Sequence, residues 1–193
     1  FDAILRTIDI AQARGVKVFN NMVVNKKNYA EVEAVLEDCE RRGVVFHAQP
    51  VVFGRAFFDS SAKDLQLSAE ETRSLNLRLA EWKRRGRRVL FLPSSYARAA
   101  RWHDYDDLNL PGQAWSSCFA GRDYVHIEPN GDVYPCNLHI GFFQPKNAAR
   151  DGLGPALLHA RRHRCLDCWH PYFNERKAMF GLRWEAVRSI LRG

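Results

Sequence analysis

The hydrophobic positions in the first part of the chain alternate between helical spacing and short apolar runs. In residues 1–14 the apolar side chains recur on one helical face, at Phe1, Ile4, Leu5, Ile8 and Ala11. Residues 16–25 are rich in β-branched residues and largely apolar, which is typical of a buried parallel strand. The pattern therefore predicts a helix that ends near Gly15, followed by a strand.

The same order repeats in the next segment. Asn28 with Glu31 three residues later resembles a capping box and predicts a helix start. The inward face of this helix would carry Val32, Val35, Leu36 and Cys39. Residues 44–53 form a second run with the character of a buried strand. Helices and strands that alternate with short connections predict a parallel α/β sheet or barrel.

A third unit follows after a loop. Ser68 and Glu71 form a second capping box, and the helix that they open runs to about Arg85, with its inward face at Thr72, Leu75, Leu79 and Trp82. Residues 87–93 predict a further strand, and residues 94–104 a short helix. The pattern then loosens into a linker, so we place a domain boundary between residues 1–112 and residues 113–193.

The second domain is shorter and rich in cysteine. It contains a predicted hairpin at about 123–136, a helix around 155–163 and a Cys-x2-Cys knuckle. One final helix would place Phe180, Trp184, Val187 and Leu191 on a single face.

Composition excludes some classes of protein. No stretch approaches the roughly 20 apolar residues of a membrane span, and no signal peptide is visible. The net charge of +7 comes from arginine bursts near predicted helix ends, and no recognition motif supports a nucleic-acid partner.

Five cysteines, an odd count, favour a reducing, cytoplasmic setting. The chain begins with Phe rather than Met, so we expect it to be a fragment.

Four of the five cysteines are candidate metal ligands. Cys39 lies on the apolar face of its helix and is expected to be a core residue. Cys165 and Cys168 have the two-residue spacing that directs two sulfurs at one centre, and Cys118 and Cys136 flank the predicted hairpin. A disulfide is disfavoured in the cytoplasm. The spacing alone leaves a four-cysteine zinc site and an iron–sulfur cluster both open.

The hairpin carries a family resemblance. Cys118, twelve residues, Gly131, four residues and Cys136 resemble the cysteine signature of the SPASM and twitch auxiliary-cluster domains of radical S-adenosylmethionine (radical SAM) enzymes. The phrase HIEPNGDVYPC is similar to the typical hairpin of that family, in which Asn130-Gly131 supplies a positive-φ turn. Residues 1–53 resemble the second half of the family's partial (β/α)6 barrel, a TIM-like fold.

The resemblance implies an iron–sulfur oxidoreductase or maturase. Cys118, Cys136, Cys165 and Cys168 would bind one auxiliary [4Fe–4S] cluster with no open iron, as in a twitch domain, for electron transfer. The intact enzyme would use a second [4Fe–4S] cluster to cleave S-adenosylmethionine into a radical that abstracts hydrogen from substrate. This chain lacks the Cys-x3-Cys-x2-Cys motif that binds that cluster, so we expect the fragment alone to be inactive.

The implied partners are a peptide or small-molecule substrate and an electron donor such as a flavodoxin or ferredoxin, with no membrane partner. S-adenosylmethionine would approach the strand ends near Asn25 and residues 50–53. The basic run 161–164 could offset the negative charge of the cluster. The alternative is a non-catalytic, zinc-stabilised binding module with a basic surface.

Other polar and aromatic residues are weaker candidates. His47 and Gln49 lie in a predicted barrel strand and could face a cofactor, although a hydrogen-bonded core histidine is the simpler interpretation. His126 and His139 bracket Cys136 and could replace a cysteine ligand. We expect Tyr96, Trp102 and Tyr105 to pack between the domains.

Overall fold

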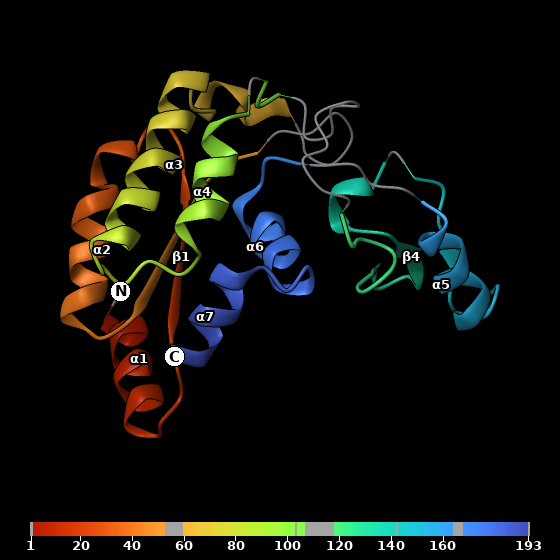
Figure 1. Ribbon diagram of the computed structural model, residues 1–193, viewed down its shortest axis with the longest axis horizontal. Coiled ribbons are helices and arrows are strands. Elements are labelled where there is room, and N and C mark those ends of the chain that lie inside the picture. Colours follow the sequence, from red (N-terminus) through yellow and green to blue (C-terminus); the bar gives the residue numbers. More distant parts are fainter. Residues whose placement is uncertain are drawn as a thin grey trace.

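The computed structural model describes residues 2–52, 60–102, 104–106, 118–141, 143–163 and 168–192. Figure 1 shows a larger region, in which helices surround β1, and a smaller region that contains β4 and α5. Helices α6 (Pro171–Phe180) and α7 (Trp184–Arg192) follow the smaller region in sequence, yet α6 packs against helix α4 (Pro93–Ala100) of the larger one. The chain therefore returns to the larger region at its C-terminal end.

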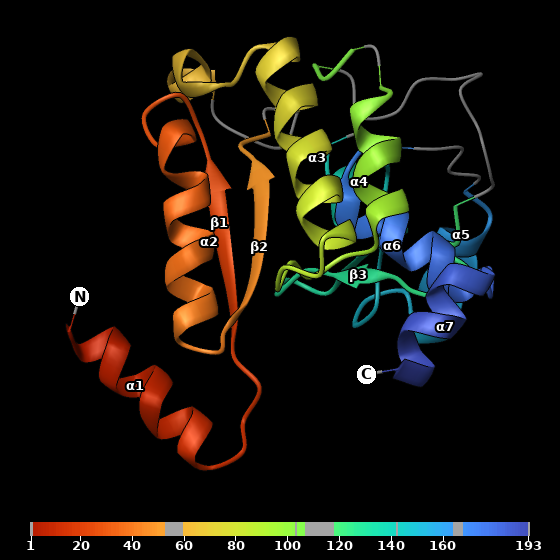
Figure 2. The ribbon, with the colours of Figure 1, turned by 60° about the vertical axis from the view of Figure 1, so that its left-hand side comes forward.

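The larger region is built on two parallel strands. Strand β1 (Phe19–Val24) pairs with β2 (Val45–Pro50) in parallel register from Phe19 opposite Val45 onward. The crossover consists of a 3-10 turn, η1 (Tyr29–Glu31), and helix α2 (Val32–Arg41), which lies beside the strands in Figure 2. Both predicted strands and the predicted crossover helix are confirmed.

Apolar side chains from these elements form the main core. The valine, leucine and phenylalanine side chains that are fully buried in this core are Val24, Val32, Leu36, Phe46, Leu75, Leu79 and Val89. Each such side chain contributes roughly 1.5–3 kcal/mol relative to an exposed one. Cys39 belongs to this core, as predicted.

The predicted third strand is reduced to one bridge. Val89 forms a parallel β-bridge with Phe46. The Phe46 amide donates a hydrogen bond to the Arg88 carbonyl at 2.8 Å, and the Leu90 amide donates one to the Phe46 carbonyl at 2.8 Å. The pairing ends there because α4 begins at Pro93, whose ring suits the first turn of a helix. In the described residues of the larger region no closed barrel is seen, and the fold shown is mixed α/β.

The two predicted capping boxes have different outcomes. Helix α3 (Ala69–Arg84) begins with a complete one: the Glu71 amide donates to the Ser68 hydroxyl at 3.1 Å, and the Ser68 amide to the Glu71 carboxylate at 2.7 Å. The box predicted at Asn28 is wrong, because its side chain is used by the preceding turn. There it accepts from the Asn25 amide at 2.8 Å and donates to the Val23 carbonyl at 3.0 Å.

Two further elements complete the larger region. The 3-10 turn η2 (Ser60–Leu65) precedes α3. Helix α1 (Asp2–Ala13) has close to its predicted bounds but buries no side chain, and Ile4 is 62% exposed. Of the predicted apolar face, Ile8 packs partly against the core. The face is thus largely uncovered.

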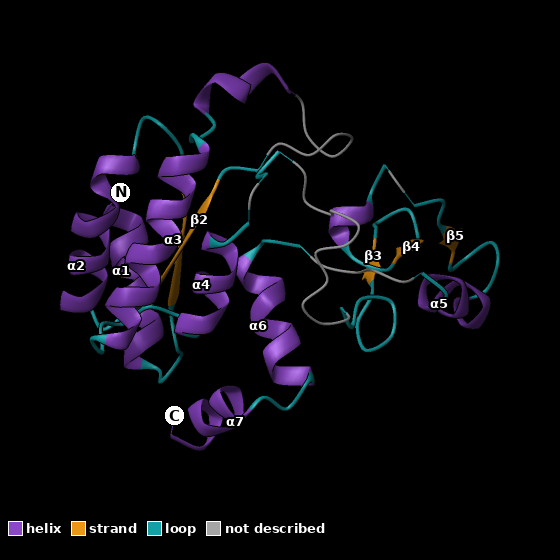
Figure 3. Ribbon diagram, turned by 45° about the horizontal axis from the view of Figure 1, so that its top comes forward, coloured by secondary structure: helices purple, strands orange, loops and turns teal. Residues whose placement is uncertain are grey.

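The smaller region contains an antiparallel sheet in the order β3-β4-β5, seen beside α5 in Figure 3. Its strands are β3 (His126–Ile127), β4 (Asp132–Tyr134) and β5 (Lys146–Asn147). Strands β3 and β4 form the predicted hairpin. A 3-10 turn, η3 (Asn137–His139), follows β4, and α5 (Leu153–Arg161) packs Ala156 and Ala160 against Val133.

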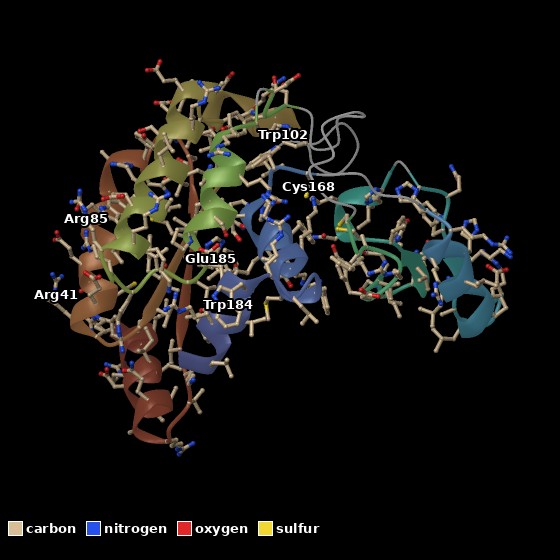
Figure 4. All side chains as sticks on the ribbon, in the orientation of Figure 1. Arg41, Arg85, Trp102, Cys168, Trp184 and Glu185 are labelled. Carbon is tan, nitrogen blue, oxygen red and sulfur yellow. The ribbon has the colours of Figure 1, made fainter. Side chains whose placement is uncertain are left out.

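The predicted final helix is confirmed for Trp184, Val187 and Leu191, which lie in α7, but Phe180 ends the separate helix α6. The Arg183 amide donates to the Ala178 carbonyl at 3.0 Å and the Leu182 amide to the Met179 carbonyl at 3.0 Å, which is a Schellman end to α6. Leu182 takes the left-handed position, with φ 48°, that a glycine usually occupies. Trp184 begins α7 and is 71% exposed (Figure 4).

None of the helices in the described part of the chain combines the length and the apolar character that crossing a membrane requires.

Glu175 joins α6 to the start of α4. Its carboxylate accepts a hydrogen bond from the Leu92 amide at 3.0 Å and one from the Ser95 hydroxyl at 2.6 Å. Leu92 is the N-cap residue of α4, so a side chain of α6 supplies the cap that Leu92 cannot. Burial raises the pKa of the Glu175 carboxyl, and the two hydrogen bonds oppose that rise.

We predict that Glu175→Ala lowers the free energy of unfolding by about 1–3 kcal/mol, because two buried donors lose their acceptor. Urea denaturation followed by circular dichroism measures the change. Glu37→Ala, at an exposed position of α2, is the control and should change stability by less than about 0.5 kcal/mol. Equal effects of the two substitutions would contradict the role given to Glu175.

Candidate iron–sulfur site

The hairpin turn between β3 and β4 depends on Gly131. The Gly131 amide donates to the Glu128 carbonyl at 2.8 Å, and Gly131 has φ 90°. Asn130 does not share this conformation, because Leu182 is the one described non-glycine residue with positive φ. The turn is therefore a three-residue loop with glycine last, not the Asn-Gly form that we predicted.

Asn147 of β5 braces this turn. Its amide nitrogen donates to the Asn130 carbonyl at 2.7 Å and to the Asp132 carboxylate at 3.0 Å. A Cβ on Gly131 would lie 3.1 Å from the Asn147 amide group. Both the backbone conformation and this close approach require glycine at position 131.

Three of the four predicted ligand cysteines lie in one apolar cluster. Cys136 and Cys168 are 5% and 4% exposed, and Cys118 packs at the edge of the cluster. The same cluster contains Trp102, Tyr105, Leu138, Trp169 and Phe173. Figure 4 shows Trp102 and Cys168 near the junction of the two regions. Cys165, the fourth predicted ligand, lies outside the described residues.

The surroundings of these cysteines keep them protonated unless a metal displaces the proton. Burial raises the pKa of the Cys136 thiol to about 12 and that of Cys168 well above its usual value. Hydrogen bonds from backbone N–H groups oppose this rise in pKa. Leu138 and Asn137 donate to Cys136, and His170 donates to Cys168. Such donors stabilise thiolates, which are the form that binds iron.

Tyr124 is a neighbour of the cysteines that sequence reasoning missed. Its hydroxyl lies 3.4 Å from Cys118 Sγ, and its ring stacks on Phe173 and on Phe180, with centroids 6.4 and 6.1 Å away. Burial raises the pKa of the Tyr124 hydroxyl, and the thiols of Cys118, Cys136 and Cys168 raise it further. The hydroxyl therefore remains a donor. It lies between Cys118 and Gly131, but nothing in the spacing distinguished it.

Among the described residues, which do not include Cys165, no group of three His, Cys, Asp or Glu side chains is placed to hold a metal ion. The indole N–H of Trp169, next to Cys168, is buried without a hydrogen-bond partner and could donate to a cluster sulfur.

The histidines considered as replacement ligands have other contacts. His126 pairs with Glu128 on the hairpin. The ring of His139 lies 4.5 Å from that of His163, and burial lowers the pKa of His139 to about 4.

His47 lies in the main core beside two aromatic rings. Its Nδ1 is 3.2 Å from the Tyr96 hydroxyl, and its ring centroid is 4.5 Å from that of Phe91. Gln49 forms a hydrogen bond with it, and burial lowers the pKa of His47 to about 4. This is the hydrogen-bonded core histidine of the simpler interpretation. Trp102 and Tyr105 pack in the cysteine cluster, whereas Tyr96 packs with His47.

The strand ends expected near S-adenosylmethionine are partly described. The Asn25 side chain accepts from the Lys27 amide at 2.8 Å, and Pro50 is buried at the end of β2. Phe53 lies outside the described residues.

Comparison with known proteins identifies the smaller region. Residues 118–169 match the family model of SPASM, an iron–sulfur cluster-binding domain. This match covers all four cysteines that we predicted as ligands, including Cys165. It supports iron–sulfur binding by this part of the chain. SPASM domains bind auxiliary clusters and are typical of radical SAM enzymes. No curated protein matches the chain.

We predict that Gly131→Ala destabilises the protein by about 1–2 kcal/mol, because alanine is strained at positive φ. The free energy of unfolding measures this. Glu37→Ala, at an exposed position of α2, is again the control and should change stability by less than about 0.5 kcal/mol. A stable Gly131→Ala variant would show that the turn tolerates a side chain.

Stability should also fall on acidification through His47. The pKa of His47 in the folded protein lies below the ordinary histidine value of 6.5. Its contribution to the free energy of unfolding is therefore complete above about pH 6.5 and is lost as the pH falls towards 4. The shift corresponds to about 3 kcal/mol. Urea titrations at pH 7 and pH 4.5 should show a smaller pH-dependent loss in His47→Leu than in the wild type. Equal losses would contradict this origin.

Proposed function

We propose that this chain is part of a radical SAM enzyme and holds one auxiliary [4Fe–4S] cluster through Cys118, Cys136, Cys165 and Cys168. The observation that carries the proposal is that Cys118 lies in one apolar cluster with the buried thiols of Cys136 and Cys168, within residues 118–169, the segment that matches SPASM. Thiolate ligands from a hairpin and a Cys-x2-Cys segment suit such a cluster.

The parallel unit at the start of the chain supports the barrel half of the proposal. Strand β1 pairs with β2 on one side and with no other named strand in the described residues. On β1 itself Phe19 and Val23 are 53% and 45% exposed, and Ile10 of the neighbouring α1 is 54% exposed. Further strands and helices of a partial (β/α)6 barrel would cover these apolar side chains in an intact enzyme.

The residues around the cysteines suit electron transfer. A bound [4Fe–4S] cluster with four cysteine ligands would accept or deliver one electron at a time. The apolar cluster of Trp102, Tyr105 and Trp169 excludes water, and the backbone N–H groups at Cys136 and Cys168 offset negative charge on sulfur. Tyr124 would donate its hydroxyl proton in a hydrogen bond to the Cys118 thiolate.

The substrate would be a peptide or small molecule, and the electron donor a small redox protein such as a flavodoxin or ferredoxin. In the intact enzyme, hydrogen abstraction would take place at the barrel, and the auxiliary cluster would relay an electron to or from the reaction.

Anaerobic reconstitution with iron and sulfide tests the proposal. The expected product has about four irons and four sulfides per chain and a broad visible absorption. Cys118→Ala, Cys136→Ala and Cys168→Ala should each lose most of this absorption. Cys39→Ala is the control and should retain it, because Cys39 lies in the other core. One zinc per chain without colour would instead establish the zinc-stabilised binding module.

A further inference from the structure

A small cavity lies beside Cys136, between the hairpin and α6. Its volume is about 190 Å³. Tyr124, Cys136 and Asn137 form one side, and Tyr172 and Arg176 of α6 form the other. Of the three described candidate ligands, Cys136 alone lines the cavity.

Arg176 is the cation of this cavity. Its guanidinium carbon lies 4.6 Å from the centroid of the Tyr124 ring and 4.4 Å from that of Tyr172. These cation–π contacts hold the side chain in place. In the described part of the chain, no carboxylate forms a salt bridge or hydrogen bond with Arg176.

Arg122 shows how a neighbouring arginine differs. It also lies over a ring, 4.4 Å from the centroid of Phe119. However, its Nε and one terminal nitrogen donate to the two oxygens of Asp123, each at 3.1 Å. The charge of Arg122 is thus compensated by Asp123. Among the described residues, no carboxylate compensates the charge of the Arg176 guanidinium in this way.

The contacts leave Arg176 suited to a carboxylate. Aromatic rings contact the guanidinium carbon, and the five N–H groups lie in the guanidinium plane, where they match the two oxygens of a carboxylate. The side-chain amide of Asn137 also lines the cavity, and its nitrogen can supply a second N–H donor. The volume is below the 300–1,000 Å³ of a drug-sized pocket, so it suits one small acid or one acidic side chain.

We propose that this cavity binds a carboxylate group of the substrate through Arg176, and that its occupation lowers the reduction potential of the neighbouring cluster. This inference rests on the proposed function. A bound carboxylate neutralises the positive charge of Arg176 beside Cys136, so the reduced and more negative cluster becomes less favourable. By linkage, reduction of the cluster weakens carboxylate binding to the same extent.

The test uses the reconstituted chain, with benzoate as the probe. We expect benzoate to lower the midpoint potential of the wild type and of Arg122→Gln, and to leave that of Arg176→Gln unchanged. Without benzoate, Arg176→Gln should already have a lower potential than the wild type. Its benzoate affinity, measured by calorimetry, should be about 10–100-fold weaker, the loss expected for a charged hydrogen-bonded pair.

Arg176→Lys separates charge from geometry. It keeps the positive charge but not the fork, so its potential should stay near that of the wild type while benzoate binds more weakly. An N-acetylated peptide with one glutamate, compared with benzoate, distinguishes the two sources of the carboxylate. The source that binds more tightly and gives the larger shift of the potential is the one that the site serves.

The outcomes separate this inference from the proposed function. If the cluster assembles but benzoate shifts the potentials of wild type and Arg176→Gln equally, or shifts neither, the carboxylate site is wrong and the cluster assignment stands. If no cluster assembles, the proposed function fails. Calorimetry on the metal-free chain then tests the carboxylate site. The site is supported if benzoate binds and Arg176→Gln abolishes that binding, and any other result overturns it.

Discussion

The attachment of α6 to α4 through Glu175 is the contact on which the candidate site depends. Cys168 lies three residues before α6, and Phe173 and Arg176 lie on it, so whatever positions this helix also positions one thiol and two neighbours of the cluster. The Glu175 carboxylate accepts from the first turn of α4 at 2.6 and 3.0 Å. A polar contact between helices far apart in sequence therefore sets where the C-terminal ligand meets the hairpin.

Desolvation dominates the chemistry of the site. Buried thiols at Cys136 and Cys168 hold their protons tightly, so a metal must displace those protons in order to bind. Backbone N–H groups lower this cost at each sulfur, and Tyr124 adds a hydroxyl beside Cys118. Arg176 adds a positive charge beside Cys136. Together these groups would set the electrostatic environment of an auxiliary cluster.

Much of the fold was predictable because it follows from local patterns. The parallel strands, the helices between them and the box at Ser68 depend on periodicity and on side chains within one turn. The errors arose where a different local arrangement prevailed. The Asn28 side chain serves the preceding turn instead of a helix cap. The last helix broke because Leu182 adopts a left-handed conformation that propensity assigns to glycine.

The sequence by itself determined the hairpin, the choice of four cysteines and the resemblance to auxiliary-cluster domains, because cysteine spacing and Gly131 are local features. Only the tertiary structure decided that Cys118, Cys136 and Cys168 share one buried apolar cluster, and that Tyr124 and Arg176 stand beside it. These neighbours come from segments separated by much of the smaller region. Their proximity results from the packing of α6 between the hairpin and α4, which no local pattern encodes.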